Sequence, residues 1–88
     1  MPVYLADRDL PGITLAQLAV ARRAVVETSR DFTAAGRPVR YVRSTFVPAE
    51  GHCMCIFEAP DVATVRAVNE TAGLPFTRIV EAKELPVE

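Results

Sequence analysis

The chain has 88 residues, of which 50% are hydrophobic and 24% are charged, and its formal net charge is −1. This composition is typical of one small globular domain and excludes an intrinsically disordered chain. The arginines and the single lysine are scattered without a basic run, so we expect neither nucleic acid nor a membrane surface as a partner.

The first half of the chain predicts a strand, a helix and a second strand. Residues 2–8 are short and apolar-biased, and they precede a Pro-Gly turn. A Thr-x-x-Gln spacing that begins at Thr14 is typical of a helix capping box, and apolar residues then recur at helical intervals through Phe32. A Gly-Arg-Pro sequence ends this helix at Gly36. Residues 39–47 then alternate in polarity, as a strand does.

The second half predicts a hairpin, a second helix and a last strand. A five-residue loop over 47–51 leads into a strand over 52–58, with the sequence HCMCIFE. Asp61 has the side chain of an N-cap, and apolar residues follow it every three or four positions until Gly73. Residues 76–85 return as the last strand.

The resulting order, β-α-β-β-α-β, is the split βαβ arrangement of ferredoxin-like domains. It predicts a single α+β domain over residues 1–88, in which a four-stranded antiparallel sheet carries both helices on one face. Right-handed crossovers place the two helices side by side.

The register of the central hairpin decides which side chains face the helices. A five-residue loop places Val42 opposite Ile56 and Arg40 opposite Glu58, the latter being a favourable pair of opposite charges. It predicts that the helices cover Val42, Phe46, Met54 and Ile56, and that the other face carries Tyr41, Arg43, Thr45, Cys53, Cys55 and Phe57. A four-residue loop would shift the register and exchange half of these partners.

The side chains assigned to the uncovered face are too apolar for a surface in water. In so small a chain, the simplest cover is the same face of a second copy. We therefore expect a homodimer, packed sheet against sheet like a dimeric α/β barrel, with a groove that binds a small molecule or a metal. The candidate ligand-binding residues in this groove are Tyr41, Arg43 and Cys55.

The histidine and both cysteines of the chain lie within residues 52–55. Imidazole and thiolate suit zinc, nickel and copper, so His52, Cys53 and Cys55 are candidate ligands of a divalent transition metal. Strand alternation places His52 on the face opposite the cysteines, so simple packing of small, soft side chains is the favoured interpretation. Cys55 could also be a reactive thiolate, because the predicted register places the Arg43 guanidinium opposite it. However, no histidine lies on that face to act as the base that such a nucleophile usually requires.

Cysteine spacing and the N-terminus indicate the compartment. Two cysteines that share a strand face at a spacing of two lie about 7 Å apart, too far for a disulfide. The N-terminus lacks a basic and then apolar signal pattern. We expect reduced thiols in a cytoplasmic protein.

Catalytic signatures such as a glycine-rich phosphate loop, HExxH and GxSxG are absent from the sequence. Asp7, Arg8 and Asp9 lie at a strand end and would suit acid–base chemistry, although a solvated loop is the simpler interpretation. Whether the chain is an enzyme stays open. The alternatives to a ligand-binding module are a small enzyme of the dimeric α+β barrel type that uses an inter-subunit cavity, and a pure assembly module.

Three segments, RDLPGIT, STFVPAEGHCMCIFEAP and NETAGLPFTRIVEA, resemble a family of small bacterial proteins catalogued as DUF4242. The resemblance implies a ferredoxin-like fold, and one branch of that family is described as nickel-binding and dimeric. That branch carries histidines in a pattern similar to HERAGHP, and the matching residues here are Asn69 and Leu74. Asparagine is a poor nickel ligand and leucine is none. We therefore take the fold and the dimer from the resemblance and leave nickel binding out.

Overall fold

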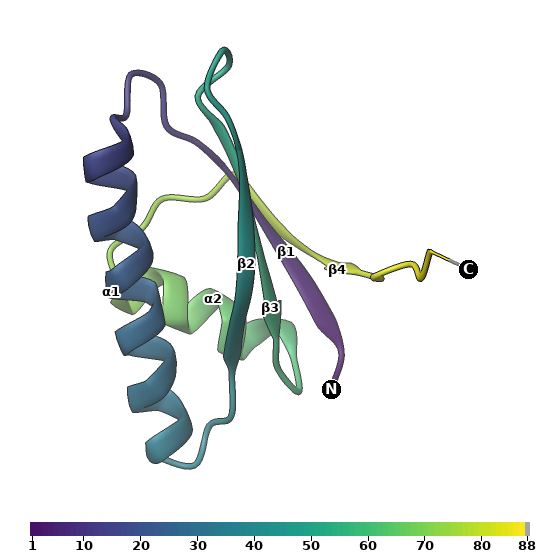
Figure 1. The fold of residues 1–88 in the computed structure, drawn as a ribbon. Coiled ribbons are helices and arrows are strands. Elements are labelled where there is room, and N and C mark those ends of the chain that lie inside the picture. The colour runs from purple at the N-terminus through teal and green to yellow at the C-terminus, as the bar shows by residue number, and fades with distance from the viewer. Residues whose placement is uncertain (88) are drawn as a thin grey trace.

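The computed structural model describes residues 1–87 and confirms the predicted order of elements. The strands are β1 (Val3–Asp9), β2 (Arg40–Val47), β3 (His52–Glu58) and β4 (Arg78–Ala82), and the helices are α1 (Leu15–Ala34) and α2 (Val62–Thr71). Figure 1 shows both helices on the same side of the sheet. The molecule is an α+β domain of ferredoxin-like arrangement.

Both helices begin where the capping residues predict. The Thr14 hydroxyl accepts a hydrogen bond from the Gln17 backbone N–H at 3.1 Å, and the Gln17 side chain accepts one from the Thr14 backbone at 3.0 Å. At the start of α2, the Asp61 carboxylate accepts from the Thr64 backbone N–H at 2.8 Å. Each cap satisfies backbone donors that would otherwise have no partner in the first helical turn.

The loop after β1 is held close to the β2–β3 turn through Gly51. Its backbone adopts φ +65°, and a Cβ at this position would meet the Pro11 Cα at 2.8 Å. Leu10 donates a backbone hydrogen bond of 2.6 Å to the Gly51 carbonyl. Only glycine combines this left-handed conformation with so close an approach.

The four strands run antiparallel in the order β2-β3-β1-β4, which makes β1 and β3 the central pair. The connection between β2 and β3 spans only residues 48–51, one residue fewer than predicted. A β-bulge between Tyr41 and Arg43 adds one residue to β2. The two differences compensate below the bulge, so the predicted pairing of Arg40 with Glu58 is confirmed.

Beyond the bulge the register differs from the predicted one by a single position. Arg43, not Val42, lies opposite Ile56, and Ser44 lies opposite Cys55. Phe46 lies opposite Cys53. A shift of one residue exchanges the two faces of a strand, because side chains alternate with a period of two.

The predicted faces of β3 are therefore wrong. Cys53, Cys55 and Phe57 are buried under the helices, whereas Met54 and Ile56 lie half-buried on the opposite face. Phe57 belongs to one buried cluster with residues of both helices, namely Val25, Val65 and Val68. The four-residue loop, which the sequence left as the alternative, explains this exchange.

On β2, the predicted positions of the Tyr41 and Val42 side chains are also wrong, whereas that of Phe46 is confirmed. Tyr41 packs against the buried cluster and meets the Phe57 ring edge-on at 5.7 Å between centroids. Val42, predicted under the helices, falls within the bulge. Phe46 packs against the buried cluster, as predicted. Neither of the helices within residues 1–87 is long and apolar enough to cross a membrane.

Candidate functional site

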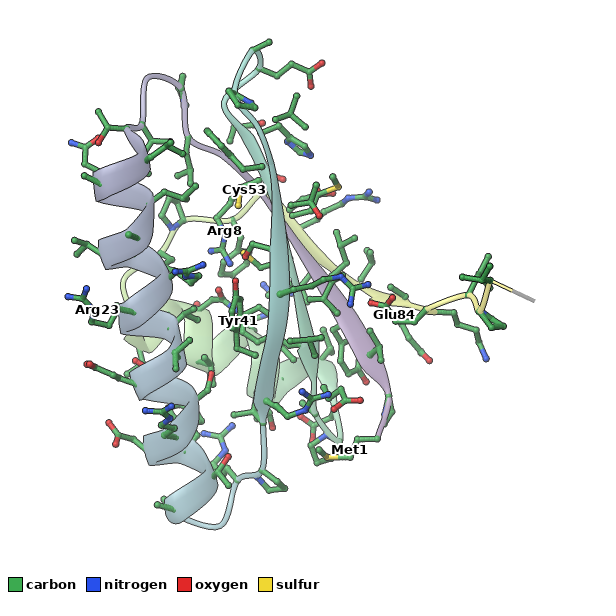
Figure 2. The ribbon with its side chains drawn as sticks, in the orientation of Figure 1. Met1, Arg8, Arg23, Tyr41, Cys53 and Glu84 are labelled. Carbon is green, nitrogen blue, oxygen red and sulfur yellow. The ribbon has the colours of Figure 1, made fainter. Side chains whose placement is uncertain are left out.

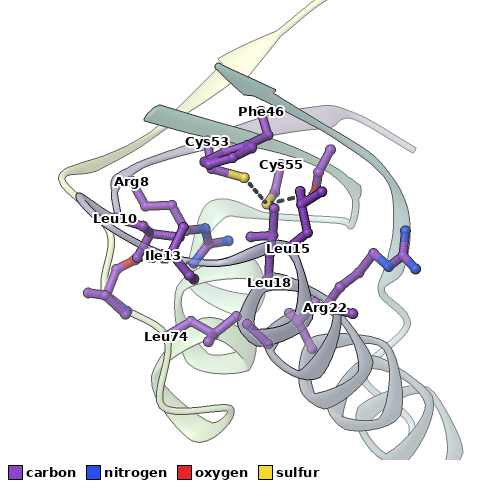
Figure 3. A pocket seen from close by; sticks show the side chains of 15 residues that line it. Arg8, Leu10, Ile13, Leu15, Leu18, Arg22, Phe46, Cys53, Cys55 and Leu74 are labelled. Atoms are coloured by element: carbon purple, nitrogen blue, oxygen red, sulfur yellow. Dashed lines mark hydrogen bonds between the residues drawn. The ribbon is translucent and has the colours of Figure 1, made fainter. Parts of the chain in front are cut away.

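A cavity of about 410 Å³ lies between α1 and the face of the sheet that the helices cover (Figure 3). Its walls are largely apolar and include Leu10, Ile13, Leu18, Val25, Phe46 and Leu74. The other lining residues include Arg8, Arg22, Ser44, Cys53 and Cys55. A largely apolar cavity with a few converging polar groups is the usual form of a small-molecule site.

Arg8 is the most unusual residue of this cavity. It follows Tyr4 and Ala6 on the helix-covered side of β1, and only 2% of it is exposed. Its Nη2 donates to the Asn69 side-chain carbonyl at 2.8 Å, and its Nη1 donates to the Pro75 backbone carbonyl at 3.2 Å. Within residues 1–87, its Nε has no hydrogen-bond partner.

The positive charge of Arg8 has no carboxylate to balance it among the cavity residues. The lining contains a second cation, Arg22, and neither aspartate nor glutamate. Both hydrogen-bond partners of Arg8 are neutral, and the carboxyl end of α2 supplies only a partial negative charge. A buried ion without a charged partner costs several kcal/mol, and the two neutral acceptors offset this cost only in part.

The two thiols line the cavity beside this charge. The sulfurs of Cys53 and Cys55 are 3.9 Å apart, and the Ser44 hydroxyl donates to the Cys55 Sγ at 2.9 Å. Burial, followed by the neighbouring Cys55, raises the pKa of Cys53 to about 11. The predicted pairing of Cys55 with Arg43 is wrong, because Arg43 lies on the opposite face, is exposed and pairs with Glu84.

Figure 2 shows the two sides of the sheet that these residues occupy. Arg8, Tyr41 and Cys53 lie between the sheet and α1, whereas Glu84 lies beyond the sheet. Of the ligand candidates, Cys55 lines the cavity, and the Tyr41 hydroxyl is hydrogen-bonded to Ser44 at its edge. The structure brings Tyr41 and Cys55 to one side and leaves Arg43 on the other. Their roles in ligand binding stay predictions.

A separate polar cluster lies on the open face, at the end of β1 and the start of β3. His52 Nδ1 lies 3.1 Å from the Asp9 carboxylate, and His52 Nε2 lies 3.1 Å from that of Asp7. Arg78 donates through Nε to the other Asp7 oxygen at 2.7 Å. As strand alternation predicts, His52 and the cysteines lie on opposite faces.

The hydrogen bond to Asp9 raises the pKa of His52, burial opposes this, and the charge of Asp7 adds to it. A raised pKa in the folded state means that protonated His52 stabilises the fold. This contribution is complete below about pH 6.5, the ordinary histidine value, and is lost as the pH rises through the folded pKa.

We expect the Asp9→Asn substitution to lower the pKa of His52, because it removes the charged hydrogen-bond acceptor. Since His52 is the only histidine, its ring protons give one unambiguous NMR titration curve. Asp31→Asn, an exposed carboxylate on α1, is the control and should leave the midpoint unchanged. Equal midpoints in Asp9→Asn and the unmodified protein would show that the pair does not form.

The described residues of this chain do not fit a resident nickel ion. Within the described part of the chain, no three His, Cys, Asp or Glu side chains are placed to hold a metal. The sheet separates His52 from Cys53 and Cys55. Asn69, which is 0% exposed, is engaged with Arg8, and Leu74 lines the cavity. Nickel prefers imidazole and other good donors, which these positions do not offer.

Comparison with known proteins places the chain near nickel-responsive proteins. The sequence model of the family described as "Nickel responsive protein SCO4226-like" matches residues 4–82. The crystal structure of SCO4226 from Streptomyces coelicolor A3(2) superposes with a TM-score of 0.82 and is 26% identical in sequence. That alignment covers 96% of this chain and 99% of SCO4226. None of the curated proteins matches the chain.

Proposed function

The chain belongs to the SCO4226-like family of nickel-responsive proteins, and from this starting point we propose that it is a small-ligand-binding module. The ligand occupies the cavity between α1 and the sheet. The groove between two sheets, which the sequence favoured, cannot be lined by Tyr41 and Cys55, because both face the helices. The DUF4242 name and a cytoplasmic location stay predictions.

The observation that carries this proposal is the cavity itself. A domain of 88 residues has only a small hydrophobic core, and protein interiors are normally packed with few voids larger than a water molecule. A space of about 410 Å³ between α1 and the sheet is of the size that small molecules occupy. Leu15, at the amino end of α1, lines it and is 74% exposed, so the cavity is open to entry at this end.

The test is binding of 1-octanol, a neutral apolar probe, followed through the NMR methyl signals of Leu10, Leu18 and Leu74. We expect these signals to shift on titration with the probe. Ala21→Leu fills the cavity from the half-buried Ala21 and should abolish the shifts. Ala16→Leu adds the same side chain at an exposed position outside the cavity and should leave them intact. Octanol and octanoate both leaving the methyl signals unmoved would refute the ligand site.

We also propose that two copies pair through the open face of the sheet. Its centre carries a stripe of half-buried apolar side chains, which are Val3, Leu5, Met54, Ile56 and Val80. Ion pairs surround this stripe, among them Arg40 with Glu58 and Asp7 with Arg78. An apolar centre with a polar rim is the usual anatomy of a protein interface, and a second copy supplies a matching one.

The ligand-binding module makes predictions that differ from those of an assembly module and of an enzyme. An assembly module without a ligand predicts dimers whose cavity binds neither probe. An enzyme that used the Cys53 thiol would need an ionised sulfur, which the raised pKa of Cys53 disfavours at neutral pH.

A further inference from the structure

The charged residues that line the cavity are all cations, and their charge indicates the chemistry of its ligand. Arg8 lies at the wall with 2% exposure, and Arg22 lies exposed elsewhere on the lining. The neighbouring carboxylates of β1 do not help, because Asp7 and Asp9 are engaged with Arg78 and His52 on the opposite face. The interior cation is therefore left without a counter-ion.

A guanidinium has five N–H donors. Arg8 uses one of them on Asn69 and one on Pro75, and within residues 1–87 its Nε–H has no acceptor. The remaining donors belong to a planar group that matches the oxygens of a carboxylate or a phosphate ester. Figure 3 shows Arg8 among the side chains that line the cavity.

The rest of the lining is largely apolar, so a free inorganic ion would leave most of the cavity without contacts. Leu10, Ile13, Leu18 and Phe46 would instead pack against a hydrocarbon body. The two thiols add little polarity, since free cysteine behaves as a small hydrophobic residue. The cavity thus combines a buried cation, Arg8, and an exposed one, Arg22, with walls that are otherwise largely apolar.

We propose that the ligand is an amphipathic anion, with a carboxylate or phosphate-ester head that pairs with Arg8 and an apolar body that fills the space between α1 and the sheet. This inference rests on the proposed ligand-binding function and specifies its ligand class. Arg8 is the residue that selects the charge, and Arg22 adds to the positive potential at an exposed part of the lining.

The experiment compares octanoate with 1-octanol, which has the same apolar chain and no charge, by calorimetry below the micellar concentration. Pairing with a buried charge predicts that octanoate binds about 10- to 100-fold more tightly. Octyl phosphate, in a third arm, distinguishes a phosphate ester from a carboxylate. None of these arms needs a substituted protein.

Two variants assign the selectivity to Arg8. Arg8→Met removes the charge and should abolish the preference for octanoate over octanol. Asn69→Asp keeps Arg8 and provides an internal carboxylate, which should compete with the octanoate head. Arg23→Met is the matched control, because this arginine on α1 is exposed and lies on the side away from the sheet (Figure 2).

The outcomes distinguish the proposal of an anionic ligand from the broader proposal of a ligand-binding module. Octanoate preferred over octanol, with the preference lost in Arg8→Met and kept in Arg23→Met, supports the anion. Equal binding of octanoate and octanol overturns the anion and leaves the ligand-binding module standing. Failure of all three probes to bind overturns both.

Discussion

Replacing Asn69 with leucine is expected to lower the free energy of unfolding by about 3 kcal/mol. Asn69 is 0% exposed and is the only side chain to which Arg8 donates within residues 1–87. Leucine has a similar size, so little space opens, but an interior guanidinium loses one of its two acceptors. The amide also gives up its own hydrogen bond to the Val65 carbonyl, which is 2.8 Å long.

A double-mutant cycle with Arg8→Met isolates this coupling. When both partners are replaced by apolar side chains, no buried polar group is left unpaired, so the Arg8→Met/Asn69→Leu protein should recover most of the lost stability. Urea unfolding measures all four proteins, and Glu70→Leu, at the exposed neighbouring position on α2, is the control with an expected change within about 0.5 kcal/mol. A double variant as unstable as Asn69→Leu alone would mean that the charge of Arg8 is not the source of the cost.

Replacing Ile56 with aspartate is expected to weaken the proposed dimer about 100-fold or more. Ile56 lies at the centre of the open face, where Leu5 and Arg43 flank it on the neighbouring strands. A charge at this position would lie next to its own copy across a two-fold axis, inside an apolar stripe. Both desolvation and like-charge repulsion oppose that arrangement.

Sedimentation velocity over a range of micromolar concentrations measures the dimer. Leu15→Asp is the control, because Leu15 is an exposed apolar residue on α1, outside the open face, and its replacement should leave the dimer intact. A monomer for the unmodified protein at these concentrations would rule out the proposed assembly. Equal dissociation by Leu15→Asp and Ile56→Asp would place the interface elsewhere.

The order of elements could be predicted because its signals are local. The capping box at Thr14 and the N-cap at Asp61 each involve residues three apart, and both are present in the structure. These caps depend little on the rest of the fold. The pairing of Arg40 with Glu58 was instead predicted from a five-residue loop, and it is present because the shorter loop and the bulge compensate.

The faces of β3 could not be predicted because both are apolar and a single residue exchanges them. The loop, which is one residue shorter than predicted, moves Phe46 from opposite His52 to opposite Cys53, and the bulge between Tyr41 and Arg43 restores the predicted pairing only at the far end of the hairpin. The residue types of β2 do not indicate a bulge. Alternation alone therefore left open whether the thiols or Met54 would lie under the helices.

The site was missed because Arg8 was considered only as a polar residue at a strand end. Arginine is almost never fully buried without a partner, so sequence alone favours an exposed position. The residues that make its burial tolerable lie 61 and 67 positions away and meet it only in the folded chain. The one available signal was alternation, since Tyr4, Ala6 and Arg8 share a face of β1.

The most direct test of the cavity as an anion site is the NMR signal of the Arg8 Nε–H, assigned by its loss in Arg8→Met. This group is buried and, within residues 1–87, has no acceptor. We predict that saturating octanoate shifts this signal strongly and that octanol does not. An unmoved Arg8 signal in protein saturated with octanoate, with the His52 ring signals shifting instead, would place the anion on the open face and contradict the account.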